Sequence, residues 1–145
     1  MSSPRRIFLS HSSSDTPAAV RLAKALESKG FEVWYSGKMA QVGSRWQAKL
    51  RTELSTADTF ILYISPDYLQ SDWSRFEAGA ALGSTLASPH ARLVPVVLPD
   101  LKPRDLPQEF RQFQTIRATG REPAKIADQL VALLATDKLN VNFEV

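Results

Sequence analysis

The chain has 145 residues, of which 43% are hydrophobic and 23% charged, a composition typical of one globular domain. Its 18 Lys and Arg and 15 Asp and Glu give a net charge of +3 without a basic stripe, so nucleic acid is not expected as a partner. The absence of cysteine excludes disulfides and thiolate chemistry, and two histidines, His11 and His90, cannot by themselves build a metal site. No apolar run is long enough for a signal peptide or a membrane span, so we expect a cytoplasmic protein with no membrane partner.

Short apolar runs and helical patterns alternate from the start of the chain. Residues 5–10 predict a strand, and the small polar residues that follow predict a loop. A helix is expected to begin at Asp15 or Thr16 and to stop at Gly30, because these residue types favour the two ends of a helix. Residues 31–35 are β-branched or aromatic in large part and predict a second strand.

The middle of the chain repeats this alternation. A loop is expected over 36–44 and a helix over about 44–57. Residues 59–64 are nearly all apolar, as in a strand that is covered on both faces. The polar residues 65–67 end this strand, and a further helix is predicted to reach about Ala87.

The last third of the chain predicts two strands and a helix. Residues 93–98 form an apolar run, and its internal Pro95 lacks a ladder donor, which indicates a position near a sheet edge or a bulge. A proline-rich loop with one turn of helix is expected over 99–110, followed by a short strand at 114–117. Helical spacing marks the last helix at Ile126, Leu130, Leu133 and Leu134.

Five strands that alternate with helices predict an α/β protein of the three-layer, flavodoxin-like kind. We expect a five-stranded parallel sheet in the order 2-1-3-4-5 with helices on both faces. Residues 1–136 are predicted to form this domain, and 137–145 a mobile C-terminal tail. Ligands bind such sheets beyond the carboxyl ends of the strands where the strand order reverses, here between the first and third strands. The loops 10–15 and 65–71 are therefore expected to line a binding site.

Trp73 and Glu77 stand one helical turn apart in the segment that follows the third strand. Phe76 and Ala80 continue the same helical face as an apolar stripe, where a carboxylate is unusual. One interpretation is structural, since Ser74 and Glu77 fit the spacing of a capping box. The other is functional, with Glu77 lining a cleft and Trp73 forming its aromatic wall. The expected strand order favours the second interpretation, because it places this helix at the crevice.

Ser10, His11 and Ser12 lie at the expected mouth of the same cleft. Their hydroxyls and backbone N–H groups can contact phosphates near a helix start, although turn and cap chemistry would also explain them. His11 is a candidate general base, but the sequence shows no residue that would orient it.

Three further candidates lie around the loop after the second strand. Lys38 and Arg45 can pair with a pyrophosphate, or they can be solvated surface residues. Trp46 begins a helical stripe that favours core packing, yet a tryptophan at a loop base can also border the site. The chain contains neither a Walker-type phosphate loop nor the glycine fingerprint of dinucleotide-binding dehydrogenases, so ATPase and hydride-transfer chemistry are not expected.

Four motifs follow one another along the chain. They are Ile7-Phe8-Leu9-Ser10-His11-Ser12 with Asp15, Gly30-Phe31-Glu32-Val33-Trp34, Gly43 with Trp46, and Ile64-Ser65-x-x-Tyr68-Leu69-x-Ser71-x-Trp73-x-x-x-Glu77. Over residues 5–135 the chain with these motifs resembles a Toll/interleukin-1 receptor-type (TIR) domain of the bacterial kind.

This resemblance implies cleavage of the nicotinamide–ribose bond of NAD+, by hydrolysis or by ADP-ribose cyclisation. The glutamate of the W-x-x-x-E motif, here Glu77, is then the catalytic residue, with Trp73 against the sugar and nicotinamide. One carboxylate suffices, because nicotinamide leaves as a neutral molecule and positive charge develops on the ribose. NAD+ is the substrate, and no cofactor or metal is expected.

The resemblance also implies partners and a setting. We expect self-association with other TIR domains, a sensor or effector protein as a further partner, and a role in bacterial immune signalling against phage. The alternative is a non-catalytic interaction module that works through TIR–TIR contacts alone. A phosphorylated receiver domain is disfavoured, because Ser10 and Ser65 stand where that fold places acidic residues at strand ends.

Overall fold

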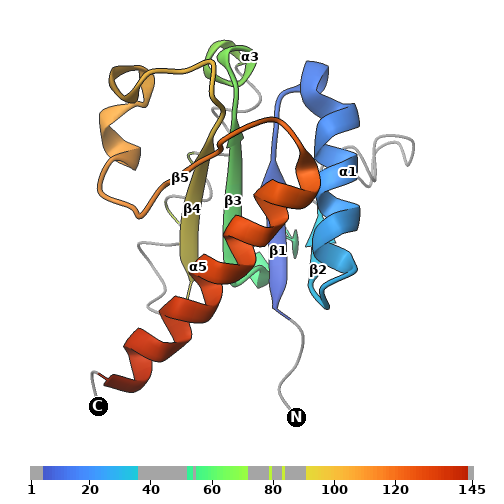
Figure 1. The fold of residues 1–145 in the computed structure, drawn as a ribbon, viewed down its shortest axis with the longest axis vertical. Helices are drawn as coiled ribbons and strands as arrows, with labels where there is room; N and C mark the ends of the chain where they lie inside the picture. Colours follow the sequence, from blue (N-terminus) through green and yellow to red (C-terminus); the bar gives the residue numbers. More distant parts are fainter. Residues whose placement is uncertain are drawn as a thin grey trace.

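The structure is a computed structural model that describes residues 5–35, 52–53, 55–71, 79, 83 and 91–143, with side chains as far as residue 135. Its centre is a sheet of five parallel strands in the order β2-β1-β3-β4-β5 (Figure 1). The strands are β1 (Arg6–Ser10), β2 (Glu32–Trp34), β3 (Thr59–Ile64), β4 (Arg92–Val97) and β5 (Ile116–Arg117). The predicted fold class and strand order are confirmed.

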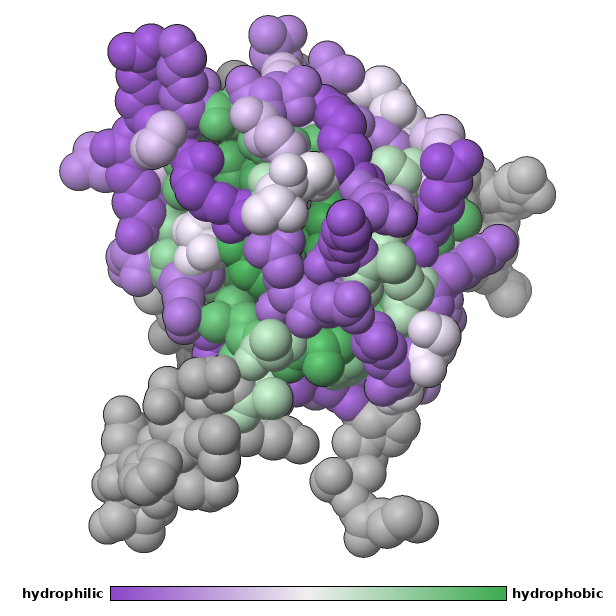
Figure 2. Space-filling model, in the orientation of Figure 1, coloured by the Kyte–Doolittle hydropathy of each residue, from purple (hydrophilic) through white to green (hydrophobic). Residues whose placement is uncertain are grey.

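Two long helices, α1 (Thr16–Glu27) and α5 (Pro123–Phe143), lie side by side on one face of the sheet (Figure 1). The other face is covered, within the described residues, by the short helix α3 (Pro66–Gln70) and by two 3₁₀ helices, η4 (Pro103–Asp105) and η5 (Gln108–Phe110). Seen from the side of α1 and α5, the outer surface is mostly hydrophilic, and hydrophobic side chains show mainly between polar ones (Figure 2). Both helices therefore turn their apolar residues toward the sheet.

The strands are apolar along their whole length because both of their faces are buried. Successive side chains of a strand point to opposite faces, so each strand contributes to two cores. The core under α1 and α5 receives Ile7, Leu9, Ile61, Tyr63, Val94 and Val96. The core on the other face receives Phe8, Phe60, Leu62, Ile64, Leu93 and Val97.

Helix α1 has the ends that the sequence predicts. Asp15 is its N-cap residue, and the helix is closed by a turn that contains Gly30. Gly30 has a φ of +98°, a conformation that side chains disfavour, and this lets the chain reverse into β2. Leu22 and Leu26 are fully buried against the sheet, so burial of this face stabilises the helix.

Helix α3 was not predicted, because residues 65–67 were expected only to end the third strand. Ser65 is its N-cap and accepts a hydrogen bond from the backbone N–H of Tyr68 at 3.0 Å, while Pro66 occupies the first helical position. A serine followed by a proline is a helix-start signal. The predicted loop 36–44, most of the helix 44–57 and nearly all of the helix expected to reach Ala87 lie outside the described residues.

Pro95 lies next to the edge of the sheet, as its missing donor indicated. The backbone N–H groups of Arg92 and Leu98 donate to the carbonyls of Asp58 and Ile64, on the β3 side of the strand. Because the N–H groups of successive residues alternate between the two sides of a strand, the ring nitrogen of Pro95 faces β5. On that side β5 begins only at Ile116, opposite Val96. The missing donor therefore coincides with the start of a two-residue edge strand.

The end of the chain differs from the expected tail. Helix α5 continues to Phe143, so most of the segment 137–145 is helical. The reason is local, since neither glycine nor proline follows Pro123 and nothing in the sequence stops the helix.

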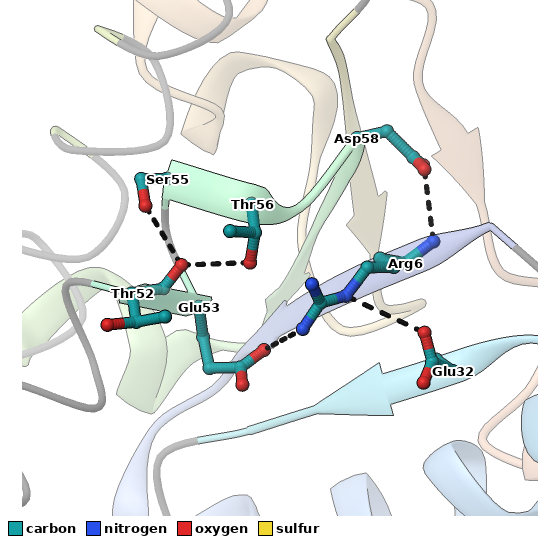
Figure 3. A network of polar contacts seen from close by, with 7 residues as sticks. All are labelled: Arg6, Glu32, Thr52, Glu53, Ser55, Thr56 and Asp58. Carbon is teal, nitrogen blue, oxygen red and sulfur yellow. Dashed lines mark hydrogen bonds and ion pairs between the residues drawn. The ribbon is translucent and has the colours of Figure 1, made fainter.

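A charged cluster joins the amino ends of the first three strands (Figure 3). Nη2 of Arg6 lies 3.1 Å from Oε2 of Glu53, and its Nε lies 3.6 Å from Oε2 of Glu32. The backbone N–H of Arg6 donates to Oδ2 of Asp58 at 3.1 Å. Only 8% of Glu53 is exposed, so its carboxylate depends on the guanidinium for much of its stabilisation.

Replacing Arg6 with methionine is expected to lower the free energy of unfolding by about 1–2 kcal/mol, because a nearly buried carboxylate loses a charged partner. The partial exposure of Arg6 keeps this below the cost for a fully buried pair. Urea denaturation measures the change. The control is Lys125→Met, which removes an exposed pair with Glu122 and should change stability by less than about 0.5 kcal/mol. Equal losses of stability in the two variants would contradict the inference that the guanidinium of Arg6 stabilises the carboxylate of Glu53.

Candidate functional site

Three serine hydroxyls gather where β1 and β3 end, at the point where the strand order reverses. Ser10 is the last residue of β1, Ser12 lies in the loop after it, and Ser65 follows β3. Their exposed fractions are 0%, 3% and 2%, so all three are buried. Buried hydroxyls need hydrogen-bond partners, and the partners that they have here come from both loops.

Asp15 joins the two loops. Its Oδ2 accepts hydrogen bonds from the hydroxyls of Ser12 and Ser65, both at 2.5 Å. Although Asp15 is the N-cap residue of α1, its side chain makes no capping bond, because these two hydroxyls engage it. The carboxylate thus ties the start of α1 to the start of α3, 50 residues further along the chain.

Two more contacts hold α3 against the end of β1. The hydroxyls of Ser10 and Tyr68 lie 2.9 Å apart, and both residues are buried. The hydroxyl of Ser14 donates to Oδ2 of Asp67 at 2.7 Å. The loops after β1 and β3 therefore form one hydrogen-bonded unit that presents polar groups at the carboxyl edge of the sheet.

His11 is held in this unit with one ring nitrogen unused. Its Nδ1 lies 2.7 Å from the carbonyl oxygen of Ser12, so Nδ1 carries the proton and donates it. Nε2 is buried and has no hydrogen-bond partner among the described residues. The ring lies against Tyr35, with 6.0 Å between the ring centroids. The Ser12 carbonyl is the orienting partner that the sequence did not reveal.

Burial lowers the pKa of His11, against smaller opposing effects of the Ser12 carbonyl and the charge of Asp15. The imidazole is therefore neutral at neutral pH, and Nε2 offers a lone pair. If a ligand hydroxyl reaches this buried nitrogen, the nitrogen can accept a hydrogen bond or a proton from it.

The lowered pKa of His11 predicts that stability falls as the pH is lowered through and below 6.5. The unfolded chain takes up a proton on this histidine near its model value of 6.5, whereas the folded protein does so only at lower pH. The stability that the neutral, buried ring contributes is therefore fully present above about pH 6.5, and it is lost as the pH falls toward the pKa of the folded state. Urea denaturation at several pH values between about 7.5 and 5 measures the slope.

His11→Gln is expected to reduce this slope, since a glutamine does not titrate. An unchanged slope in the variant would show that His11 titrates alike in the folded and unfolded chain.

The structure brings together three of the predicted site residues, Ser10, His11 and Ser12. The others lie outside the described residues: Trp73, Glu77, Lys38, Arg45 and Trp46. Asp15, Ser65 and Tyr68 lie in the two loops that were predicted to line the site, 10–15 and 65–71, but were not among the predicted site residues. The sequence signal for two of them is their position at a helix start. Asp15 lies directly before the helix that follows β1, and Ser65 lies directly before the helix that follows β3.

These features define a parallel α/β domain whose polar site lies at the switch point of its sheet, a common place for small ligands in this class. No helix within the described part of the chain is long and apolar enough to cross a membrane. The chain belongs to the TIR domain family, since the family model described as TIR domain matches residues 7–131.

Relatives within this family have assigned activities. Over 61% of its length the chain is 33% identical to the 2' cyclic ADP-D-ribose synthase BtTIR of Bacteroides thetaiotaomicron, and it covers 31% of that protein. Over 62% of its length it is 26% identical to the NAD(+) hydrolase TirS of Staphylococcus aureus, and it covers 32% of that protein. The chain thus spans about a third of the length of these curated relatives.

A similar solved structure also contains a TIR domain. The metazoan TIR-STING receptor from C. gigas, solved in complex with 2',3'-cGAMP, superposes with a TM-score of 0.62 at 30% identity. The superposition covers 76% of this chain and 34% of the receptor chain.

Proposed function

We propose that the protein is an NAD+ nucleosidase that cleaves the bond between nicotinamide and ribose. The observation that carries this proposal is the hydroxyl cluster at the carboxyl ends of β1 and β3, with the lone pair of His11 beside it. Helix α3, which this cluster holds in place, ends at Gln70, three residues before Trp73 and seven before Glu77. Two relatives, a cyclic ADP-ribose synthase and an NAD+ hydrolase, support the choice of substrate.

In the proposed reaction the bond between the ribose C1' and the pyridinium nitrogen breaks. The electron pair stays with the nitrogen, so nicotinamide leaves neutral and requires no general acid. Positive charge develops on the ribose, and the carboxylate of Glu77 stabilises it. Water then attacks C1' and releases a proton to give ADP-ribose, or an adenine nitrogen or ribose hydroxyl attacks to give a cyclic product.

The remaining residues bind and orient the substrate in this proposal. The neutral His11 accepts a hydrogen bond from a ribose hydroxyl through Nε2, while Ser10 and Ser12 hold the loop that presents it. Trp73 covers the sugar and nicotinamide and excludes water.

Lys38 and Arg45 pair with the pyrophosphate in the same proposal, because two cations around the loop after the second strand match its two negative phosphates. Trp46, at the base of that loop, borders the site.

Self-association belongs to the proposal as well. We propose that the active form is an assembly of TIR domains, that a sensor or effector protein acts with it, and that the setting is bacterial defence against phage. The second candidate function, a TIR–TIR interaction module without catalysis, shares the assembly and differs only in the chemistry.

The test follows nicotinamide release from NAD+ by chromatography over a wide range of protein concentrations, with light scattering in parallel to detect assembly. We expect release that rises more steeply than the protein concentration. ADP-ribose among the products indicates hydrolysis, and a cyclic isomer indicates cyclisation. Assembly without any nicotinamide release would overturn the proposal in favour of the interaction module.

A further inference from the structure

An open groove with a volume of about 580 Å³ lies beside the carboxyl ends of β4 and β5. The segment that carries η4 and η5, drawn in orange in Figure 1, forms its outer wall. Three arginines line it, over a floor of apolar side chains: Arg104, Arg111 and Arg117 above Val97, Pro103 and Leu106. Among the residues that the structure describes, no acidic side chain contributes to the lining.

The guanidinium groups of these arginines form no ion pair with any residue that the structure describes. Arg111 is instead held by backbone, with Nε donating to the carbonyl of Leu106 at 3.0 Å and Nη2 to that of Arg104 at 3.1 Å. The carbonyls fix the direction of the group without cancelling its charge. Three of its five N–H groups remain for a ligand.

The carboxylates of the same segment are directed elsewhere. Asp105 accepts from the backbone N–H of Lys102 at 2.8 Å, and Asp100 pairs with Arg121 at 2.5 Å. Glu109 is exposed and does not line the groove. Among the described residues, no carboxylate therefore pairs with the three arginines of the groove.

We propose that this groove binds the phosphate groups of a small organic phosphate such as a nucleotide. A guanidinium matches two oxygens of a phosphate with parallel hydrogen bonds, and three of them suit a ligand with more than one phosphate. The volume lies within the usual range of about 300–1,000 Å³ for small-ligand pockets, which leaves room for an organic body on the apolar floor.

This groove lies apart from the described part of the candidate active site, the cluster around Asp15, and the proposal for it does not rest on the proposed function. Neighbouring strands lie about 4.8 Å apart, so β4 and β5 place the groove one to two strands beyond β3 along the same edge. The groove shares no residue with the cluster around Asp15. Occupation of the groove can thus be measured whether or not NAD+ is cleaved.

The test is calorimetric titration of the whole chain with inorganic pyrophosphate and, separately, with ATP. We expect pyrophosphate to bind with a dissociation constant of about 1 mM or tighter, and ATP to bind more tightly because its base and sugar add contacts. Arg104→Gln and Arg117→Gln should each weaken both ligands by about tenfold. Amide shifts in NMR spectra should concentrate at Thr115 and Arg117.

The matched control is Arg21→Gln, which removes the same charge from the exposed side of α1. It should leave both affinities within about twofold, since a distant surface charge is screened by salt. Equal weakening by all three variants would overturn the proposal, because it would show attraction to net charge alone. Binding of an acidic peptide in the groove with no binding of pyrophosphate would overturn it in favour of a protein partner.

Discussion

Nicotinamide release from NAD+ is expected to fall by at least about a hundredfold when Glu77 is replaced by glutamine. The reason is electrostatic, since the glutamine amide has nearly the shape of the carboxylate but not the negative charge that opposes the developing positive charge on the ribose. The expected signature is a loss of kcat with little change in KM, because the carboxylate acts chiefly in the transition state.

The same substitution separates the two interpretations of Glu77. A capping box accepts glutamine as readily as glutamate, so a purely structural role predicts nearly normal stability and activity in the variant. Glu109→Gln, an exposed change of the same kind on η5, serves as the control and should leave release unchanged. Wild-type release in Glu77→Gln would remove the catalytic assignment.

The parts of the fold that the sequence predicted are those that burial dictates. The strand over 59–64 was predicted at its observed bounds, because a strand buried on both faces is apolar throughout. Strand order followed from the alternation of strands and helices, which restricts parallel sheets to few topologies. The elements that were missed or misjudged, α3 and the end of α5, are decided by caps and by the absence of a stop signal rather than by an apolar period.

The sequence predicted those residues of the candidate site that directly follow a strand, but not the bonds between residues far apart in the chain. Ser10, His11 and Ser12 follow the first strand directly, and the switch-point rule was enough to place them. The bond between Asp15 and Ser65 joins residues 50 positions apart, and no local pattern encodes such a pair. It depends on the pairing of β1 with β3, which sets the start of both helices side by side.

Asp15→Ala is expected to lower the free energy of unfolding by about 2–3 kcal/mol, because two buried hydroxyls lose their charged acceptor. The hydroxyl of Ser65 would then remain as a donor in a place with almost no access to water, and that of Ser12 would keep only the hydroxyl of Ser14 at 3.2 Å. Since the same bonds fix the loops around the candidate site, nicotinamide release should also fall by about tenfold or more. Urea denaturation and the chromatographic assay measure the two effects.

The matched variants divide the role of Asp15 into charge and geometry. Asp15→Asn keeps one oxygen that can accept from a hydroxyl, so it should lose about 1 kcal/mol and retain more of the activity. Asp128→Ala removes an exposed aspartate that pairs with Lys29, and it should change stability by less than about 0.5 kcal/mol. If Asp15→Ala prevents folding, Asp15→Asn still carries the test. A loss in either Asp15 variant no larger than in Asp128→Ala would mean that the loops hold their positions without this carboxylate.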